Sequence, residues 1–550
     1  MTSSAQIAPL PASRAKVADA IARTLHSYGV RFAFGIPGND VLETIRACAE
    51  AGIEFVVTRA EPAACFMADA VWQRTGKPAA LIPALGPGIA NATAGIAGAL
   101  MERTAMIVLS GEMATAQMGI YNHQVFDHVA LATPVTKYAA QLNPARAGQH
   151  VARALDIALS HPAGPVLLNV PADHGRGEAT RLPDFRPPAV MATVLAPPAL
   201  AAARAMLGEA KRPVALLGRG ALARGVAESV RRFVEAWRMP FLASYKAKGV
   251  IDDGHPLCLG SVGLSPVIDA ENLRLIGEAD LIVLIGFDPI ELRDAWLDAW
   301  DERRPCLTID WGPQTHRIFP VGAQALGDVP SILDQLAAEA APGSDWPPDR
   351  LAALASKVAH IVRPRAPSRG ISPAALFKAV SDRATPDWIM TVDVGAHRIL
   401  ANHVIRCRSP GQLLQSNGLG CMGYAVPAAI GAQLVETERT VVAMLGDGCM
   451  MMTAGELATA AERGLPIVVV VLNDSALALI KLKQSKMQME PRAVDFGTTR
   501  FDKVAEGFGF AGVRVETIEA FDRAFAAAVA SRRPTLIDAQ IDPAEYWEQM

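Results

Sequence analysis

The sequence predicts an α/β protein of three doubly wound domains, each with a parallel sheet between layers of helices. Short runs rich in Val, Ile and Leu alternate with longer Ala-rich segments along all 550 residues. This alternation is typical of buried parallel strands joined by helices. Proline-rich stretches at 181–198 and 341–373 interrupt it and are typical of linkers. A chain of this length is expected to form about three domains.

The expected strands follow one another in chain order. They include residues 55–57, 106–110, 166–170, 214–217, 281–287, 388–392, 441–445 and 467–472. The linkers divide them into domains at 1–180, 196–340 and 370–550, and a short helix is expected at 351–362 inside the second linker. Segments 163–173 and 533–543 share a proline before a terminal strand and an Asp with Pro after it. This echo hints that the first and third domains share a topology.

Composition and charge exclude several function classes. Hydrophobic residues make up 51% of the chain and charged residues 19%, which indicates a folded globular protein. With a net charge of −3 and no long Lys or Arg run, nucleic acid is not an expected partner. The apolar runs are too short to span a membrane, and the N-terminus lacks a signal-peptide pattern. Seven scattered cysteines without a C-x-x-C pair fit a reducing, cytoplasmic location and exclude a conventional zinc site.

Residues 441–475 carry the most specific chemical pattern. The strand at 441–445 runs into Gly446-Asp447-Gly448, a helix is expected at 454–463, and the next strand ends at Asn473. Ligands of such units bind outside the carboxyl ends of the strands, where Asp447 and Asn473 both emerge. Their oxygens suit Mg²⁺, and the glycines let backbone amides approach phosphate. A lone Gly-Asp-Gly is usually an ordinary turn, but this placement is more specific.

This pattern resembles the signature of thiamine diphosphate-dependent enzymes, a Gly-Asp-Gly followed by some two dozen residues and an Asn. The resemblance implies that thiamine diphosphate is the cofactor. It also implies that Asp447, Asn473 and the carbonyl of Ser475 hold the Mg²⁺ that anchors its diphosphate. Gly446, Gly448 and Cys449 are then expected to line the cofactor.

Two further segments of the third domain resemble the same family. The stretch TVDVGAHRIL at 391–400 resembles the diphosphate-binding loop, which implies contacts from Val394, Gly395, Ala396 and His397. The stretch SNGLGCMGYAVPAAIGAQ at 416–433 resembles the segment that bends the cofactor, with Gly420 lining it and Met422 as the supporting side chain. A Met in such a segment is otherwise most often a core filler.

In the first domain, Glu61 matches the family's cofactor-activating carboxylate. The resemblance implies that it hydrogen-bonds the aminopyrimidine ring of a cofactor held by a partner subunit. Decarboxylases usually have His-Glu here, whereas this chain has Ala60-Glu61. One Glu at a helix start more often complements the helix dipole. The flanking segments 34–40 and 84–99 also match, however, and place Pro37, Gly38 and Asn91 near the ring.

Within the family, segments 108–142 and 494–517 resemble the acetolactate synthase large-subunit branch. Two departures concern the expected substrate pocket. Glu112 stands where synthases have Gln, and His123-Gln124-Val125 replaces Phe-Gln-Glu. Glu112 and His123 are therefore catalytic candidates. His123 could shuttle protons near neutral pH or be an ordinary loop residue, and the sequence leaves both open.

The central domain resembles one that binds FAD in some synthases. Because GFDPIELR at 286–293 replaces an Arg-Phe-Asp-Asp-Arg-like run, FAD is not expected. The helix Glu of pyruvate decarboxylases is also missing, since Ile480 falls about where it would stand.

The function that the resemblance implies is decarboxylation of a 2-oxo acid, followed by ligation of the remaining acyl unit to a second carbonyl. The alternative is a non-ligating decarboxylase or C–C lyase for another substrate, and a remote one is a non-catalytic cofactor-binding protein. The family's active site forms between subunits. The resemblance therefore implies at least a homodimer, and commonly a homotetramer.

Overall fold

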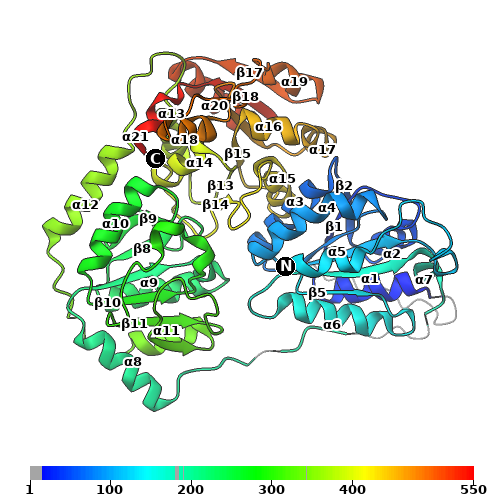
Figure 1. The fold of residues 1–550 in the computed structure, drawn as a ribbon, viewed down its shortest axis with the longest axis horizontal. Helices are drawn as coiled ribbons and strands as arrows, with labels where there is room; N and C mark the ends of the chain where they lie inside the picture. The colour runs from blue at the N-terminus through cyan, green and yellow to red at the C-terminus, as the bar shows by residue number, and fades with distance from the viewer. Residues whose placement is uncertain (1–14, 180–184, 190, 342, 550) are drawn as a thin grey trace.

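The computed structural model describes residues 15–179, 185–189, 191–341 and 343–549. Within these residues it contains three parallel sheets of six strands with helices between the strands, so the α/β prediction of three doubly wound units is confirmed. Figure 1 shows the three units as separate bodies, with the third packed against both of the others. Parts of the predicted first linker, residues 181–184 and 190, lie outside the described residues, as do residues 1–14.

The first unit has the strand order β2-β1-β3-β4-β6-β5. Its strands are β1 (Phe32–Gly35), β2 (Glu54–Val57), β3 (Ala79–Leu81), β4 (Met106–Glu112), β5 (Tyr138–Gln141) and β6 (Pro165–Pro171). Its helices are α1 (Val17–Ser27), α2 (Leu42–Glu50), α3 (Glu61–Thr75), α4 (Pro87–Met101), α5 (His128–Ala132), α6 (Ala147–Leu159) and α7 (Ala172–Arg176). Helices α1, α2 and α6 share a core with one face of the sheet, and α3 and α4 with the other.

The central unit has the order β12-β11-β10-β7-β8-β9. Its strands are β7 (Pro213–Leu217), β8 (Phe241–Ser244), β9 (Cys258–Val262), β10 (Leu281–Ile285), β11 (Cys306–Asp310) and β12 (Ala323–Leu326). Its helices are α8 (Pro197–Glu209), α9 (Val226–Ala236), α10 (Pro266–Glu278) and α11 (Val329–Ala337). Helix α12 (Pro348–Ile361) crosses the second linker and confirms the short helix expected there.

The third unit has the order β14-β13-β15-β16-β18-β17. Its strands are β13 (Ile389–Val392), β14 (Leu413–Gln415), β15 (Val441–Gly446), β16 (Val468–Asn473), β17 (Ala511–Val515) and β18 (Thr535–Gln540). Its helices are α13 (Pro373–Arg383), α14 (Ala396–Val404), α15 (Ala425–Val435), α16 (Asp447–Thr453), α17 (Glu456–Glu462), α18 (Ala478–Lys486), α19 (Phe501–Gly507), α20 (Ile518–Ser531) and α21 (Tyr546–Gln549).

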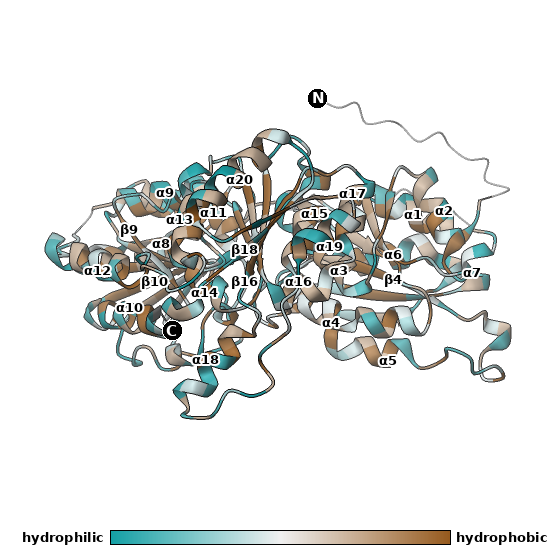
Figure 2. Cartoon of the chain, turned by 90° about the horizontal axis from the view of Figure 1, so that it is seen from above, coloured by the Kyte–Doolittle hydropathy of each residue, from teal (hydrophilic) through white to brown (hydrophobic). Residues whose placement is uncertain are grey.

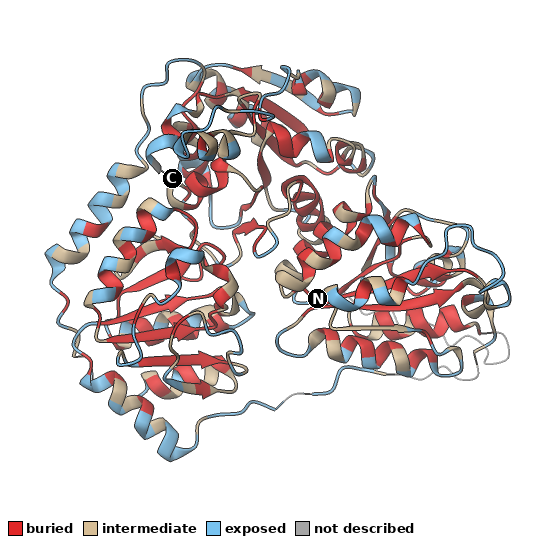
Figure 3. Ribbon diagram, viewed as in Figure 1, coloured by how far each residue is buried: buried red, intermediate tan, exposed pale blue. Residues whose placement is uncertain are grey.

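The first and third sheets have the same strand order, counted within each unit. This confirms the shared topology that the segments 163–173 and 533–543 hinted at. Both segments contain the fifth strand of their sheet's order, β6 and β18, which is the last strand of each unit in the chain. The inner strands of the sheets, such as β4, β6, β10 and β16, are buried on both faces, as parallel sheets require, whereas the edge strands β2, β5, β12 and β17 are partly exposed (Figures 2 and 3).

One continuous hydrophobic core joins the first and third units. It combines side chains of α3 and α4 with side chains of α15 and α17, and α3 and α15 lie side by side in Figure 1. The two helices approach closely at Gly431, where a Cβ would lie 2.4 Å from the carbonyl oxygen of Met67. Tyr424, just before α15, donates its hydroxyl to Asp69 of α3 at 2.7 Å.

A buried polar junction ties all three units together. Lys246 of the central unit contacts Glu102 of the first at 2.8 Å, and both side chains are at most 5% exposed. Glu102 also accepts the backbone N–H of Asn417, and Lys246 donates to the carbonyl of Gln415. These bonds fix the segment after β14, which leads into the predicted cofactor loop at 416–423. None of the described helices is long and apolar enough to cross a membrane.

Candidate active site

Asp447 and Asn473 emerge at the same edge of the third sheet. They follow or end the adjacent parallel strands β15 and β16, in a register that pairs Gly446 with Leu472. Both residues are buried. The helix expected at 454–463 is present as α17, and a short helix that the sequence did not predict, α16, precedes it and begins at Asp447 itself. The reason is that the Asp447 carboxylate accepts the Gly448 N–H at 2.7 Å and lies in the first helical turn, where a negative charge is favoured.

Two hydrogen bonds from its amide nitrogen fix the orientation of the Asn473 side chain. Its Nδ2 donates to Asp538 Oδ1 at 2.9 Å and to the carbonyl of Thr499 at 3.2 Å. Its oxygen accepts only a long bond from the Ser475 N–H, at 3.3 Å. Ser475 has a positive φ of 60°, a conformation that L residues rarely adopt. The oxygen of Asn473 therefore keeps acceptor capacity for a further partner.

Two carboxylates crowd this edge without a basic side chain bonded to either. Burial raises the pKa of Asp447. Burial, and then the charge of Asp447, raise the pKa of Asp474 to about 7. The Oδ2 atom of Asp474 is buried and has no hydrogen-bond partner in the described part of the chain. A divalent cation beside these oxygens would offset both the burial and the repulsion.

His397, in the first turn of α14, faces the same edge. Burial lowers the pKa of its imidazole to about 3, so the ring is neutral, and its Nε2 atom has no hydrogen-bond partner. The ring lies against two glycines: a Cβ on Gly446 would be 3.3 Å from His397 Cε1, and one on Gly395 would be 2.6 Å from it. Gly395, at the N-cap of α14, is preceded by Val394 and followed by Ala396, so the predicted loop lies next to the Gly-Asp-Gly turn.

The loop before α15 reaches the same place. A Cβ on Gly448 would lie 3.5 Å from Met422 Cε, so Met422 packs beside the turn. Gly420 and Gly423 have φ values of 65° and 85°, which only glycine adopts readily. Cys449 donates its thiol to the Val394 carbonyl at 3.2 Å. The third unit thus brings Met422, Cys449 and the predicted loop at 394–397 to the Gly-Asp-Gly turn.

Glu61 belongs to the first unit. It is buried at the first position of α3 and accepts a hydrogen bond from the Asn91 side chain of α4. The residue that fixes the start of α3 comes from the third unit: Glu456 accepts the backbone N–H groups of Arg59 and Ala60 at 2.8 and 3.1 Å. No sequence motif singled out Glu456, because its partners are backbone groups nearly 400 residues away.

Glu112 belongs to a buried polar cluster at the carboxyl edge of the first sheet. It accepts from Asn169 Nδ2 at 2.7 Å, and its Oε2 lies 3.4 Å from His128 Nδ1. Nε2 of His128 also accepts the Gly86 N–H at 3.3 Å. Asp40 sits next to this cluster, where a Cβ on Gly111 would collide with it, and burial raises its pKa. The sequence offered Glu112, but not His128, Asn169 or Asp40.

His123 is not part of this cluster. It is exposed in the segment between η1 (Thr115–Gln117) and α5, with its ring centroid 6.1 Å from that of Tyr121. Pro37 is exposed as well, and a Cβ on Gly38 would lie 2.6 Å from both Ala84 Cβ and Asp40 Oδ1. The pyrimidine-side residues therefore line an open edge of the first unit, and a role for His123 stays a prediction.

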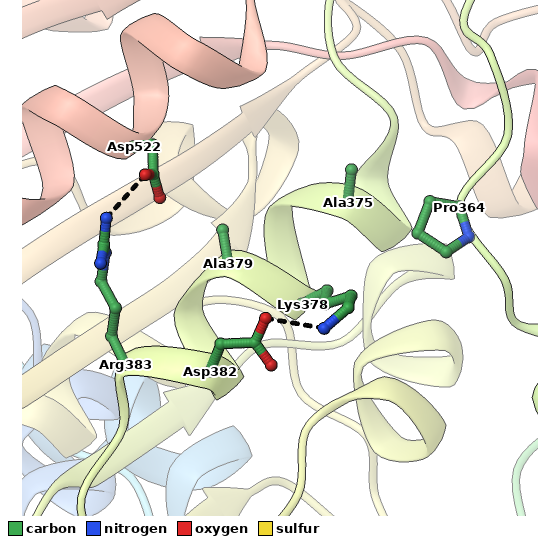
Figure 4. Close-up of a pocket in the computed structure, with 7 residues that line it drawn as sticks. All are labelled: Pro364, Ala375, Lys378, Ala379, Asp382, Arg383 and Asp522. Atoms are coloured by element: carbon green, nitrogen blue, oxygen red, sulfur yellow. Dashed lines mark hydrogen bonds and ion pairs between the residues drawn. The ribbon is translucent and has the colours of Figure 1, made fainter.

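A separate surface pocket lies between α13 and α20. Figure 4 shows its lining residues, Pro364, Ala375, Lys378, Ala379, Asp382, Arg383 and Asp522. Its charged groups pair with one another, Arg383 with Asp522 at 2.6 Å and Lys378 with Asp382 at 2.7 Å. It lies away from the strand ends, and we assign it no role.

Family models for three successive domains match this chain. They are the N-terminal thiamine pyrophosphate binding domain over residues 15–131, the central domain over 200–336, and the C-terminal thiamine pyrophosphate binding domain over 393–539. The chain belongs to the thiamine pyrophosphate enzymes. It is an enzyme of that class, which includes carboligases and decarboxylases. The alternative of a non-catalytic cofactor-binding protein is therefore excluded.

Curated relatives extend over nearly the whole chain. The acetolactate synthase of Bacillus subtilis is 30% identical over 96% of this chain and 93% of its own. Acetolactate synthase isozyme 2 large subunit of Escherichia coli is 28% identical over 96% and 95%. The probable 2-ketoarginine decarboxylase AruI of Pseudomonas aeruginosa is 30% identical over 94% and 93%. The relatives thus include both reaction types that the sequence left open.

The third unit of this thiamine pyrophosphate enzyme fits the cofactor and a divalent cation. Oxygens of Asp447 and Asn473 lie at adjacent strand ends, Asp474 Oδ2 and His397 Nε2 are buried without partners, and Gly446 leaves space beside the imidazole. Hard oxygen ligands beside a diphosphate are what Mg²⁺ requires. The described residues contain no cluster of three His, Cys, Asp or Glu side chains that could hold a metal ion.

Proposed function

We propose that the protein uses thiamine diphosphate and Mg²⁺ to decarboxylate a 2-oxo acid and to join the remaining acyl unit to a second carbonyl. The observation that carries this proposal is the convergence, at one strand edge, of Asp447, Asn473 and the His397 ring, whose Nε2 has no partner among the described residues. When bound, thiamine diphosphate supplies a nucleophilic carbon that attacks the 2-oxo acid and accepts the electrons released with CO₂.

The roles of the chain's own residues follow from their contacts. Asp447, Asn473 and the Ser475 carbonyl would hold Mg²⁺, and Asp538 keeps the Asn473 oxygen turned toward it. Residues 394–397 would bind the diphosphate, and Met422 would support the bend of the cofactor. Glu61 would hold a proton at the aminopyrimidine ring, and Asn91 orients its carboxylate. Cys449, Gly420, Gly446 and Gly448 would line the cofactor.

We further propose that two copies of the chain complete each site. Glu61 and Asn91 both belong to the first unit, where the Asn91 amide donates to the Glu61 carboxylate. On α16, directly after the Gly-Asp-Gly turn, Met451 and Met452 are 60% and 61% exposed. Apolar side chains beside a cofactor site are expected to be covered, and a second copy would do so. A homodimer is the minimum, and the tetramer, the cytoplasmic location and the domain limits 1–180, 196–340 and 370–550 stay predictions.

Ligation is favoured over simple decarboxylation for two reasons. Ile480 on α18, about where pyruvate decarboxylases have a Glu, offers no proton to an acyl unit. Several of the relatives are named acetolactate synthases.

A second candidate function is decarboxylation or C–C cleavage of a cationic 2-oxo acid. The buried carboxylate of Glu112 and the half-buried carboxylate of Asp40 favour it, and one relative is named a 2-ketoarginine decarboxylase. Both candidates can be tested together by incubating the holoenzyme with pyruvate, neutral 2-oxo acids and guanidino or amino 2-oxo acids. We expect a ligated hydroxy-keto acid by mass spectrometry. Aldehyde and CO₂ alone, formed fastest from a cationic acid, would favour the second candidate.

A further inference from the structure

The central sheet has the strand order that, in doubly wound proteins, forms a nucleotide-binding crevice at the point where the order reverses. From β7 the chain continues to β8 and β9 on one side, then crosses to β10, β11 and β12 on the other. The strand order therefore reverses between β7 and β10. Ligands of such sheets bind outside the carboxyl ends of the strands at this point, with phosphate on the backbone N–H groups of the first turn. The turns concerned follow Leu217 and Ile285.

In this protein the two turns pack directly on each other. Gly220 donates its N–H to the Gly286 carbonyl at 2.8 Å. A Cβ on Gly218 would lie 2.3 Å from Phe287 Cα, and one on Gly286 would lie 2.6 Å from the backbone nitrogen of Ala221. The glycines therefore serve contact between two backbones and leave no passage for a ligand phosphate.

The anion position itself is filled by Glu291. This side chain is fully buried and comes from η5 (Pro289–Glu291), just after β10. Both carboxylate oxygens lie 3.0 Å from the Arg219 backbone nitrogen in the first turn, and Oε1 accepts the Asp288 N–H at 3.0 Å. The Ser244 hydroxyl at the end of β8 donates to Oε2. These backbone and hydroxyl donors are the kind that bind a phosphate.

The acidic residue at the end of the next strand, Asp310, also has its carboxylate bonded within the chain. Asp310 ends β11, and its carboxylate accepts from the Trp311 N–H at 2.8 Å and from Gln314 Nε2 at 3.1 Å. His161 of the first unit approaches Asp310 to 3.8 Å and packs on Gly312, where a Cβ would lie 2.8 Å from its ring. Groups that could bind a ribose and its neighbouring phosphate are thus used within the chain.

The same contacts support the predicted cofactor loop. Ile290, next to Glu291, packs against Gly418, where a Cβ would lie 2.3 Å from Ile290 Cδ1. Asp288, at the N-cap of η5, pairs with Arg103 of the first unit at 2.7 Å. Holding η5 in place therefore also holds the 416–423 loop.

We infer that Glu291 occupies the place of a ligand phosphate, so that the central domain binds neither FAD nor an adenine nucleotide. It acts instead as a scaffold for the loop at 416–423. The residues present do not fit FAD, because the donors that would receive its diphosphate already bind this carboxylate. This inference does not depend on which reaction the enzyme catalyses.

The test uses the full-length protein saturated with thiamine diphosphate and Mg²⁺, so that the diphosphate half-site is already filled. Calorimetric titration with ADP, and absorption spectra after incubation with FAD and desalting, are expected to show no binding to the unmodified protein. Glu291→Ser removes the carboxylate and exposes the Arg219 and Asp288 N–H groups. We expect inorganic phosphate to raise the thermal midpoint of this variant and not that of the unmodified protein. Exposed Glu302 in the same domain provides the matched control, Glu302→Ser.

Stoichiometric binding of ADP or FAD to the unmodified protein would overturn the inference. So would a folded Glu291→Ser variant that responds to phosphate no more than the control does. If Glu291→Ser does not fold, the titrations of the unmodified protein decide the question without it. The inference is supported if phosphate stabilises only Glu291→Ser and if neither ADP nor FAD binds to the unmodified protein.

Discussion

Glu61 and Asp538 illustrate two ways in which single residues would serve the proposed reaction. Glu61 would touch the cofactor, whereas Asp538 acts through Asn473, whose amide nitrogen it holds at 2.9 Å. Substituting Glu61 should impair turnover without affecting cofactor binding. Substituting Asp538 should weaken cofactor binding without affecting turnover at saturating cofactor. Each role can therefore be tested separately at the residue scale.

Glu61→Gln is expected to lower turnover by about 100-fold or more, because the amide cannot exchange a proton with the cofactor ring. Thiamine diphosphate binding, followed by calorimetry, should change little, and circular dichroism should show an unaltered fold. The control is Glu438→Gln, whose side chain is 92% exposed. Turnover within twofold of that control would refute the role of Glu61.

Asp538→Ala frees the Asn473 amide to rotate away from the metal. Loss of such a supporting partner is expected to weaken Mg²⁺-dependent cofactor binding by about 10- to 100-fold. At saturating cofactor the turnover number should stay close to normal, and Asp538→Asn, which keeps an acceptor oxygen, should restore part of the affinity. Equal affinity in Asp538→Ala and the unmodified protein, measured by titration with Mg²⁺ present, would exclude this role.

At the scale of elements, the contacts between units hold the functional segments in place. Helix α3 carries Glu61 and packs on α15, which follows the loop with Met422. The Lys246–Glu102 pair fixes the chain just before the same loop. Both contacts are buried, so changes there should be costly.

Gly431→Ala should destabilise the α3–α15 contact, because the new methyl group would lie 2.4 Å from the Met67 carbonyl. Overpacking of this kind costs about 1–3 kcal/mol of unfolding free energy. Gly208→Ala in α8 is the matched control, since nothing lies within 4 Å of its added Cβ. The control should be neutral or slightly stabilising, and urea unfolding of both variants gives the comparison. Equal midpoints would contradict the close approach.

Lys246→Met leaves Glu102 buried without its partner. Breaking a buried ion pair in this way costs about 3–5 kcal/mol. The double variant Lys246→Met with Glu102→Gln removes the stranded charge and should recover part of the loss, as read from thermal midpoints. A single variant that is as stable as the double variant would show that the pair does not stabilise the junction.

At the scale of the whole molecule, the proposed dimer makes a prediction that single variants cannot test. Glu61→Gln and Asp447→Asn subunits should each be inactive alone. Co-expressed with different tags, they would form mixed dimers in which one site has both Glu61 and Asp447 intact. A random mixture should then recover about a quarter of normal activity, since half of the dimers are mixed and each has one good site. No recovery in purified mixed dimers would place the site within one chain.

Much of this architecture could be predicted from the sequence. Runs such as VVVVLN at 468–473 specify buried parallel strands locally, and the prediction succeeded because such strands have few other stable arrangements. The helix predicted at 454–463 was found as α17, but the short helix α16 before it was missed, because the Gly-Asp-Gly at its start is more often an ordinary turn. The sequence did not predict roles for His128 and Glu456, because a single polar residue outside a motif gives no signal in the sequence.

The sequence by itself determined the class of protein, the three parallel sheets and the placement of Asp447 and Asn473 at adjacent strand ends, because spacing along neighbouring strands fixes position in space. Only the tertiary structure decided which distant groups meet. It brought Glu456 to the start of α3, His128 rather than His123 to Glu112, and Glu291 to the point where the strand order of the central sheet reverses. These contacts join segments far apart in the chain or depend on how loops close, and no local pattern encodes them.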